Sequence, residues 1–259
     1  MKKQNQTSEP FLTIPNKFIQ CNIENKFNMG REFYVIYLLI SKNRSALNLN
    51  QSYLTIKDVL DFYGIKKYGG KKPQVYYSII NILTVMIKNN MIEIDMSLDE
   101  LNNVKYNSCI RINICDKFTV NRDYTKLNRS QINYIFSDER FKSNRNLLTC
   151  YLYIISHIND TINNENTTDT VLKCPNAFWG SIQNMSYTLC INTRTITNCI
   201  KCLVTPTPDK PALLIKEKTK NWAMIPNIYV INKPGYEKEI EFTINYLDKI
   251  YHTKVKTEN

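Results

Sequence analysis

Apolar side chains recur at helical spacing three times within residues 31–90, and two segments with strand-like alternation follow. A buried stripe with i, i+3, i+4, i+7 spacing predicts a first helix, and it comprises Phe33, Ile36, Tyr37 and Ile40. A second helix is expected after Thr55, because its hydroxyl and the Asp58 carboxylate have the spacing of a capping box. Gly64 offers the left-handed backbone with which that helix can end.

The third helix of this series is predicted over residues 73–90, since Pro73 suits a first helical turn. One face is apolar and should be buried; it comprises Val75, Ile79, Leu83, Met86 and Ile87. The other face carries side chains that we expect in solvent, namely Gln74, Tyr76, Tyr77, Asn81 and Lys88. Residues 91–95 and 109–113 alternate apolar and polar, which predicts a hairpin joined by a polar loop over residues 97–108.

Three helices followed by a hairpin is the order of a winged helix, in which the third helix enters the DNA major groove. A lysine-rich turn with two glycines precedes the third helix here, and its lysines are Lys66, Lys67, Lys71 and Lys72. Such a turn can approach phosphate closely, although a solvated charged loop is the alternative interpretation. The hairpin loop holds Asp99 and Glu100 against Lys105, so it either contacts DNA poorly or serves protein contacts.

The same order recurs in the second half of the chain. The elements that we expect there are a connecting helix at residues 124–136, a strongly apolar helix at 147–155, a polar loop at 160–170 and a helix at 177–189. A further helix at 192–203 precedes a proline-rich turn or wing at 205–211 and two strand-like segments at 213–218 and 222–231.

The helix predicted over residues 192–203 has the most informative polar face. Asn192 is a favourable N-cap, and the buried stripe comprises Ile196, Cys199, Ile200 and Leu203. The opposite face presents short hydrogen-bonding side chains and one guanidinium, which is the chemistry used on base edges and phosphates. With the N-cap, the candidate DNA-binding residues are Asn192, Thr193, Arg194, Thr195, Thr197, Asn198 and Lys201. The candidates from the first half are the four lysines of the turn with Gln74, Tyr76, Tyr77 and Asn81.

The run Cys-Ile-Asn-Thr-Arg-Thr-Ile at residues 190–196 resembles the turn and recognition-helix start of winged-helix regulators and replication proteins, commonly Gly-[VI]-Ser-x-x-Thr-[VI]. Asn192 stands for the serine and Thr195 for the threonine, while Cys190 replaces the glycine. Residues 226–229 and 11–18 are similar to segments of plasmid and phage replication initiators. We therefore expect a mostly helical α+β chain with two tandem winged-helix domains, at residues 11–120 and 121–232, followed by a C-terminal amphipathic helix and tail at 233–259.

The formal net charge of +11 indicates a polyanionic partner, although a bias toward Lys, Asn and Ile typical of an AT-rich coding sequence explains part of that surplus. The sequence contains no Walker loop, dinucleotide fingerprint or His-x-His metal site. We therefore expect no enzymatic activity and no cofactor.

Cys199 and Cys202 have the spacing of half a zinc site, but no second close pair accompanies them. Because positions i and i+3 share a helix face, core packing is the favoured expectation for both, and no metal is expected. Residues 1–10 hold no apolar signal segment, and the longest apolar run, at 33–40, is too short for a bilayer. We expect a cytoplasmic protein without membrane association, in which the eight cysteines are reduced.

Three roles fit such a chain. The favoured one is a plasmid or phage replication initiator that acts at origin repeats, with double-stranded DNA and replication proteins as partners. The alternatives are a transcriptional regulator of a mobile element and a winged-helix adaptor that binds protein. The oligomeric state stays open, a homodimer included, because the amphipathic pattern of residues 237–251 suits packing on its own module or on another subunit.

Overall fold

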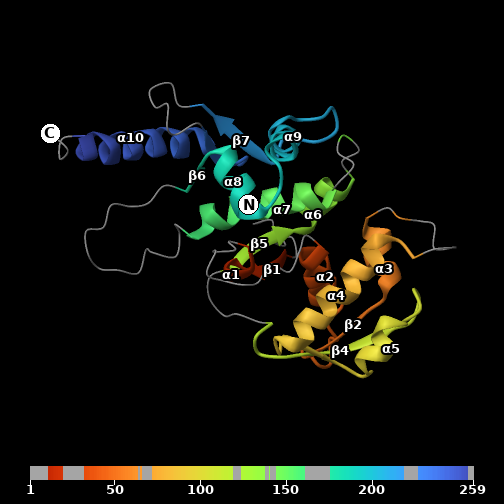
Figure 1. Cartoon of the computed structure of the whole chain (residues 1–259). Helices are drawn as coiled ribbons and strands as arrows, with labels where there is room; N and C mark the ends of the chain where they lie inside the picture. The colour runs from red at the N-terminus through yellow and green to blue at the C-terminus, as the bar shows by residue number, and fades with distance from the viewer. Residues whose placement is uncertain are drawn as a thin grey trace, which may run out of the picture. The chain divides into compact units, whose positions relative to one another are not determined.

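The computed structural model describes residues 11–19, 32–63, 65, 72–118, 124–137, 140, 144–160, 176–218 and 227–255. They form a mostly helical α+β fold with small antiparallel sheets (Figure 1). The chain divides into two compact units, which are described separately below.

The first unit runs to residue 138, later than the predicted boundary at 120. Its elements are β1 (Phe11–Pro15), α2 (Glu32–Lys42), β2 (Gln51–Leu54), α3 (Ile56–Phe62), α4 (Gln74–Lys88), β3 (Ile92–Ile94), α5 (Leu98–Asn102), β4 (Ile110–Ile114), β5 (Tyr124–Asn128) and α6 (Arg129–Phe136). The second unit contains α1 (Asn16–Ile19), α7 (Asn144–Asp160), β6 (Phe178–Trp179), α8 (Ile182–Leu189), α9 (Thr193–Val204), β7 (Leu214–Glu217), β8 (Ile228–Ile231) and α10 (Tyr236–Val255).

Three helices and a three-stranded sheet make the body of the first unit. Helices α2, α3 and α4 pack on one another, and the strands lie in the order β2-β4-β3 with antiparallel pairing throughout. The predicted capping box is confirmed, because the Thr55 hydroxyl accepts from the Asp58 amide and the Asp58 carboxylate accepts from the Thr55 amide. β2 was not predicted, since it is four residues long and its neighbour β4 is distant in sequence.

The core of the first unit surrounds α2, all of whose side chains from Glu32 to Ile40 are buried. Tyr37 donates its hydroxyl to the backbone oxygen of Phe118 at 2.9 Å, and the two rings stack with centroids 4.3 Å apart. The guanidinium of Arg44 lies 5.5 Å from the centroid of the same Phe118 ring. Burial raises the pKa of Tyr37 above its ordinary value, with the positive charge of Arg44 opposing the shift.

The segment between β3 and β4 is not the simple polar loop that its composition predicted. It contains α5, whose N-cap is Ser97, and the Ser97 hydroxyl accepts from the Glu100 amide at 3.2 Å. Leu101 and Val104 are buried, and the Lys57 amide donates to the backbone oxygen of Tyr106 at 2.9 Å. The loop is therefore packed against α3 and α4, where its apolar side chains leave solvent.

The predicted helix over residues 124–136 is correct only in its second part. Residues 124–128 form β5, which pairs antiparallel with β1 so that Leu127 lies opposite Leu12. Thr125 and Leu127 are fully buried, and the alternation of buried and open positions is that of a strand. Pairing with a segment more than 100 residues away overrides the local helical pattern. Helix α6 then follows the N-cap Asn128, where the Gln131 side chain accepts from the Asn128 amide.

The second unit repeats the element order of the first. Helix α7 carries the predicted apolar stripe, and Leu147, Leu148, Tyr151, Leu152, Ile154 and Ile155 are all buried. The sheet has the order β6-β8-β7, again antiparallel. Apart from α5, which lies between β3 and β4, a helix and a strand precede two helices and two strands in both units, and the first strand pairs with the third.

One prediction in the second unit needs correction. The helix expected over residues 177–189 begins at Ile182, because Phe178 and Trp179 pair with β8 instead. The proline-rich segment at 205–211, for which a turn or a wing was expected, is a tight turn between α9 and β7, closed by a bridge between Thr207 and Lys210. Residues 219–226, between β7 and β8, lie outside the described part, as do residues 161–175.

Helix α10 packs on its own unit, against β8. Leu247 is buried in a cluster with Ala177, Ile228 and Val230, and the rings of Trp179 and Tyr246 lie 6.0 Å apart. The sequence left open whether this helix packs on its own module or on another subunit. The contacts that the structure shows for it are with its own module. Within the described residues, no helix combines the length and the apolarity that crossing a membrane requires.

Candidate nucleic-acid interface

Helix α9 begins where the sequence predicts. The Asn192 side-chain oxygen accepts a hydrogen bond from the Thr195 amide at 2.8 Å, which satisfies one of the otherwise free donors of the first turn. The predicted buried stripe is confirmed: Ile196, Cys199, Ile200 and Leu203 are at most 3% exposed. Cys202 is also buried, so both cysteines of the Cys199–Cys202 pair pack in the core as expected.

In the turn that leads into α9, Cys190 adopts the backbone conformation that is usual for the glycine it replaces. Cys190 has φ 50° and ψ 40°, which is the left-handed conformation. The Ile191 amide donates to the backbone oxygen of Ser186 and the Cys190 amide to that of Tyr187, the pair of bonds of a Schellman motif. Ile191 is buried after this turn. The turn therefore has the left-handed geometry that a glycine commonly supplies at the end of a helix.

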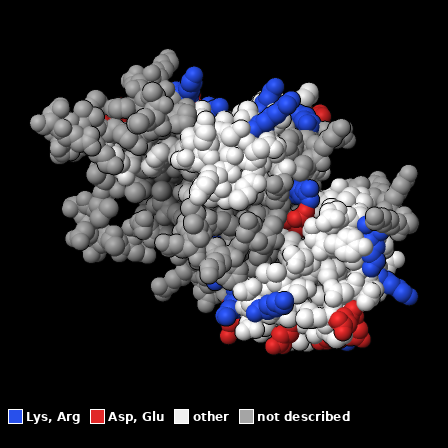
Figure 2. All heavy atoms as spheres, in the orientation of Figure 1, with Lys and Arg blue, Asp and Glu red and all other residues white. Residues whose placement is uncertain are grey.

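The polar face of α9 is open to solvent. Asn192, Thr193, Arg194, Thr197, Asn198 and Lys201 are exposed, while Thr195 is half-buried. Thr197 donates its hydroxyl to the backbone oxygen of Thr193 at 2.8 Å, which fixes its rotamer and leaves its oxygen free to accept. The helix contains no acidic residue, and Lys and Arg atoms gather on the visible surface over α9 and β7 (Figure 2). This face can therefore donate to and accept from base edges and can neutralise phosphate.

Arg140 was not a candidate from the sequence, and it hydrogen-bonds to the C-terminal end of α9. Its guanidinium donates to the backbone oxygens of Cys202 at 2.9 Å and of Thr205 at 2.8 Å. These carbonyls belong to the last turn, where helical partners are missing and a positive charge is favourable. The residue lies in a basic segment of the sequence, but nothing in that segment indicates which helix end it would reach.

Tyr187 is a second residue that was not predicted from the sequence as a candidate contact. It lies on α8 one turn before the left-handed turn, and its side chain is 72% exposed. An aromatic ring so open is unusual, because burial of such a side chain is favourable. Its position before the turn that leads into α9 makes it a further candidate contact.

The equivalent face on α4 is less basic. Gln74, Tyr77 and Asn81 are exposed, as predicted. Tyr76 is instead fully buried, which corrects the prediction that it lies on the open face. Its hydroxyl donates to the backbone oxygen of Val104 at 2.8 Å and its ring meets that of Tyr106, because the β3–β4 segment covers this side of α4.

Lys72 is half-buried beside the same tyrosine. Its ammonium donates to the Tyr76 hydroxyl at 2.9 Å and lies 4.0 Å from the ring centroid. Such contacts hold the lysine against the protein. The other lysines of the predicted turn, Lys66, Lys67 and Lys71, lie outside the described residues.

The segment between β3 and β4 is acidic on its open side. Glu93, Asp95, Asp99 and Glu100 are exposed, and Asp and Glu atoms gather over α5 and the adjoining strands in Figure 2. Hydrogen bonds from the backbone and the hydroxyl of Ser97 hold the pKa of Glu100 below its ordinary value, so its charge persists. An acidic surface of this kind repels phosphate.

Among the described residues, no three His, Cys, Asp or Glu side chains lie close enough together to hold a metal ion. Comparison of the chain with protein-family models, with curated proteins and with solved structures finds no match.

Proposed function

We propose that the chain binds double-stranded DNA in a sequence-specific manner, with α9 as the principal recognition helix. The observation that carries this proposal is the stripe of exposed polar and basic side chains on α9. Thr193, Thr197 and Lys201 follow one another at intervals of four residues, and Arg194 and Asn198 lie beside them, so all five share one face. A face of this width and composition suits the major groove.

The arrangement of elements supports winged-helix modules in both units. With α5 of the first unit left aside, each unit contains the order helix, strand, helix, helix, strand, strand, and each three-stranded sheet pairs its first strand with its third. In a winged helix the third helix of this series is the recognition helix, which corresponds to α4 and α9. The left-handed turn at Cys190 supports the assignment for α9, because it sets the angle between α8 and α9.

The two modules have different parts in this proposal. Helix α9 reads base edges, since its face combines amide, hydroxyl and guanidinium groups. Helix α4 presents Gln74, Tyr77 and Asn81 beside an acidic wing, so the described part of the first module offers few phosphate contacts. Sequence-independent attraction then comes from the net charge of +11, to which the cations of the second module contribute.

As a biological role we propose replication initiation on a plasmid or phage, by binding to origin repeats rather than by catalysis. This role rests on the tandem arrangement and on the resemblance of residues 11–18, 190–196 and 226–229 to segments of such initiators. Direct repeats beside the gene, and maintenance of a plasmid by this gene alone, would support it. An operator over its own promoter without a replication phenotype would indicate a transcriptional regulator.

The decisive experiment is selection of binding sites from a random duplex library with the full chain. The selected duplex is then titrated by fluorescence anisotropy from 50 to 300 mM salt, next to a shuffled duplex of equal length. We expect a preference of at least a hundredfold and a steep loss of affinity with salt, with a log–log slope of about −0.9 for each phosphate contact. Equal binding of both duplexes, or a flat salt response, would contradict the proposal.

A further inference from the structure

The first unit contains a cavity of about 250 Å³ that the proposed DNA-binding face does not use. Its walls come from β1, α2, α3 and α6. Five of the side chains around it are apolar, Leu38, Phe62 and Ile132 among them. The polar side chains at the cavity are Lys42, Arg129 and Asn133. The cavity is thus an apolar space with two cations and an amide at its edge.

Among the described residues, the charges at this edge are all of one sign. Lys42 and Arg129 are exposed at the cavity, and no acidic side chain lines it among the described residues. Neither cation pairs with an acidic side chain in the part of the chain that the structure describes. Two like charges beside one apolar space repel each other, and an anion between them would relieve that repulsion.

The backbone of α6 adds to the positive potential. Arg129 is the first residue of this helix, after the N-cap Asn128, and the first turn contains no acidic residue. Helix N-termini carry a partial positive charge, so a cation is unfavourable there unless an anion accompanies it. Asn133 lies one turn further along α6, at the same cavity, and can donate a hydrogen bond from its amide.

The apolar walls decide what kind of anion fits. A DNA phosphate or a free inorganic phosphate would make no contact with the apolar side chains. A neutral hydrocarbon would not pair with the cations. A carboxylate with an alkyl chain uses both. The volume holds roughly eight groups of the size of a water molecule or a methylene, which corresponds to a medium-length chain.

We propose that this cavity binds a medium-chain fatty carboxylate, with the alkyl chain against Leu38, Phe62 and Ile132 and the carboxylate between Lys42 and Arg129. The inference is independent of the proposed function, since none of these side chains belongs to the α4 or α9 face.

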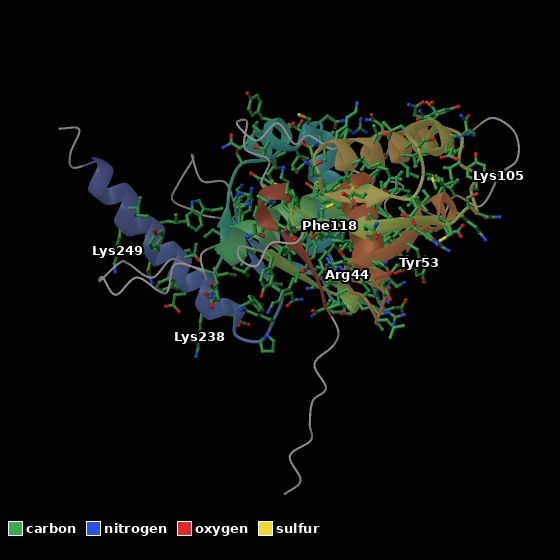
Figure 3. The ribbon with its side chains drawn as sticks, turned by 90° about the horizontal axis from the view of Figure 1, so that it is seen from below. Arg44, Tyr53, Lys105, Phe118, Lys238 and Lys249 are labelled. Atoms are coloured by element: carbon green, nitrogen blue, oxygen red, sulfur yellow. The ribbon has the colours of Figure 1, made fainter. Side chains whose placement is uncertain are left out.

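Calorimetric titration of the full chain tests it, with decanoate as the ligand and decanol as the neutral analogue of equal length. We expect one decanoate per chain, bound at least tenfold more tightly than decanol. The double variant Lys42→Gln/Arg129→Gln should lose at least tenfold in decanoate affinity while its decanol affinity stays unchanged. The matched control is Lys105→Gln, because Lys105 (Figure 3) lies between β3 and β4 and is not among the described residues that line the cavity. Its decanoate affinity should equal that of the parent chain.

Three results would overturn the proposal. Absence of decanoate binding at millimolar concentration would show that the cavity takes no such ligand. Equal affinities for decanoate and decanol would show that the cations do not hold the head group. An equal loss in the Lys105→Gln variant would assign the effect to net charge. Because the substituted side chains are at the surface, circular dichroism should show the parent fold in each variant, and DNA affinity measured in parallel keeps this result separate from the proposed function.

Discussion

Arg140 donates a hydrogen bond from its guanidinium to the backbone oxygen of Thr205, 2.8 Å away, at the end of the last turn of α9. A second bond to Cys202 makes the contact bidentate across that turn. Arg140 therefore acts on the candidate recognition helix as a positioning residue, without belonging to its open face.

Replacement of Arg140 by alanine should fray the end of α9. We expect faster amide hydrogen exchange of Thr205, whose amide donates to Lys201, and a loss of DNA affinity of about threefold to tenfold. Arg140→Lys keeps the charge but not both bonds, so it should recover only part of the affinity. Unchanged exchange in Arg140→Ala would show that the helix end holds without this residue.

Replacement of Arg194 by alanine should cost about 1–3 kcal/mol in binding to the selected duplex and relax the base preference at one position. An equal loss on all duplexes would instead mark Arg194 as a phosphate contact. The control is Lys238→Ala, which removes an exposed cation from α10, away from the α9 face (Figure 3). It should change affinity only slightly. Competitive anisotropy with duplexes substituted at single positions measures both effects.

Cys190→Gly should raise the free energy of unfolding by about 0.5–1 kcal/mol, because glycine adopts a φ of 50° without the strain of a β-carbon. Cys109→Gly is the matched control, since Cys109 is also exposed but has no left-handed backbone. There the added freedom of the unfolded chain should lower stability instead. Urea unfolding of the three proteins under reducing conditions measures the difference, and stabilisation by both substitutions would count against the turn geometry.

Two buried tyrosines should respond to loss of the hydroxyl in opposite directions. The Tyr229 hydroxyl has no hydrogen-bond partner within the described residues, so Tyr229→Phe should raise the free energy of unfolding by about 1 kcal/mol. The Tyr37 hydroxyl donates to the backbone oxygen of Phe118, so Tyr37→Phe should lower it by about 1 kcal/mol. Thermal and urea unfolding at neutral pH compare the two variants, and equal signs would refute the assignment.

Alkaline pH should destabilise the second unit through Tyr229. Burial raises the pKa of Tyr229 to about 12, from 10.0 in the unperturbed side chain. The folded protein holds the phenolic proton more tightly than the unfolded chain. The resulting stability is therefore fully present below pH 10 and is lost as the pH rises through 12. Urea unfolding between pH 9 and 12 should show a steeper fall for the parent chain than for Tyr229→Phe; parallel curves would contradict it.

The elements that sequence reasoning found are those whose pattern is local. The stripe on α9 and the capping box at Thr55 depend on residues within two turns, so periodicity and cap chemistry suffice to place them. Once the buried positions of α9 are known, the helical periodicity also gives the positions on its solvent-exposed face. Its N-cap is likewise visible in the sequence, because Asn192 and Thr195 are three residues apart.

The elements that it missed depend on distant partners. Phe178 and Trp179 form a strand of two residues because they pair with β8, which lies about 50 residues later in the sequence. Tyr76 occupies a helix position that would be open in isolation, and only the β3–β4 segment turns it into a core residue. Arg140 reaches the end of α9 across more than 60 residues of chain. Single-sequence patterns contain no information on such pairings.

The pairing of β1 with β5 sets an order of events during biosynthesis. Phe11 lies opposite Asn128, so the first strand leaves the ribosome long before its partner exists. At about 5–20 residues per second, β1 waits roughly 6–23 s as an unpaired edge, while the helices and sheet that lie between the two strands in the sequence can already fold. Nascent chains of this protein thus pass through a stage in which a strand edge is open to chaperones and to other nascent chains.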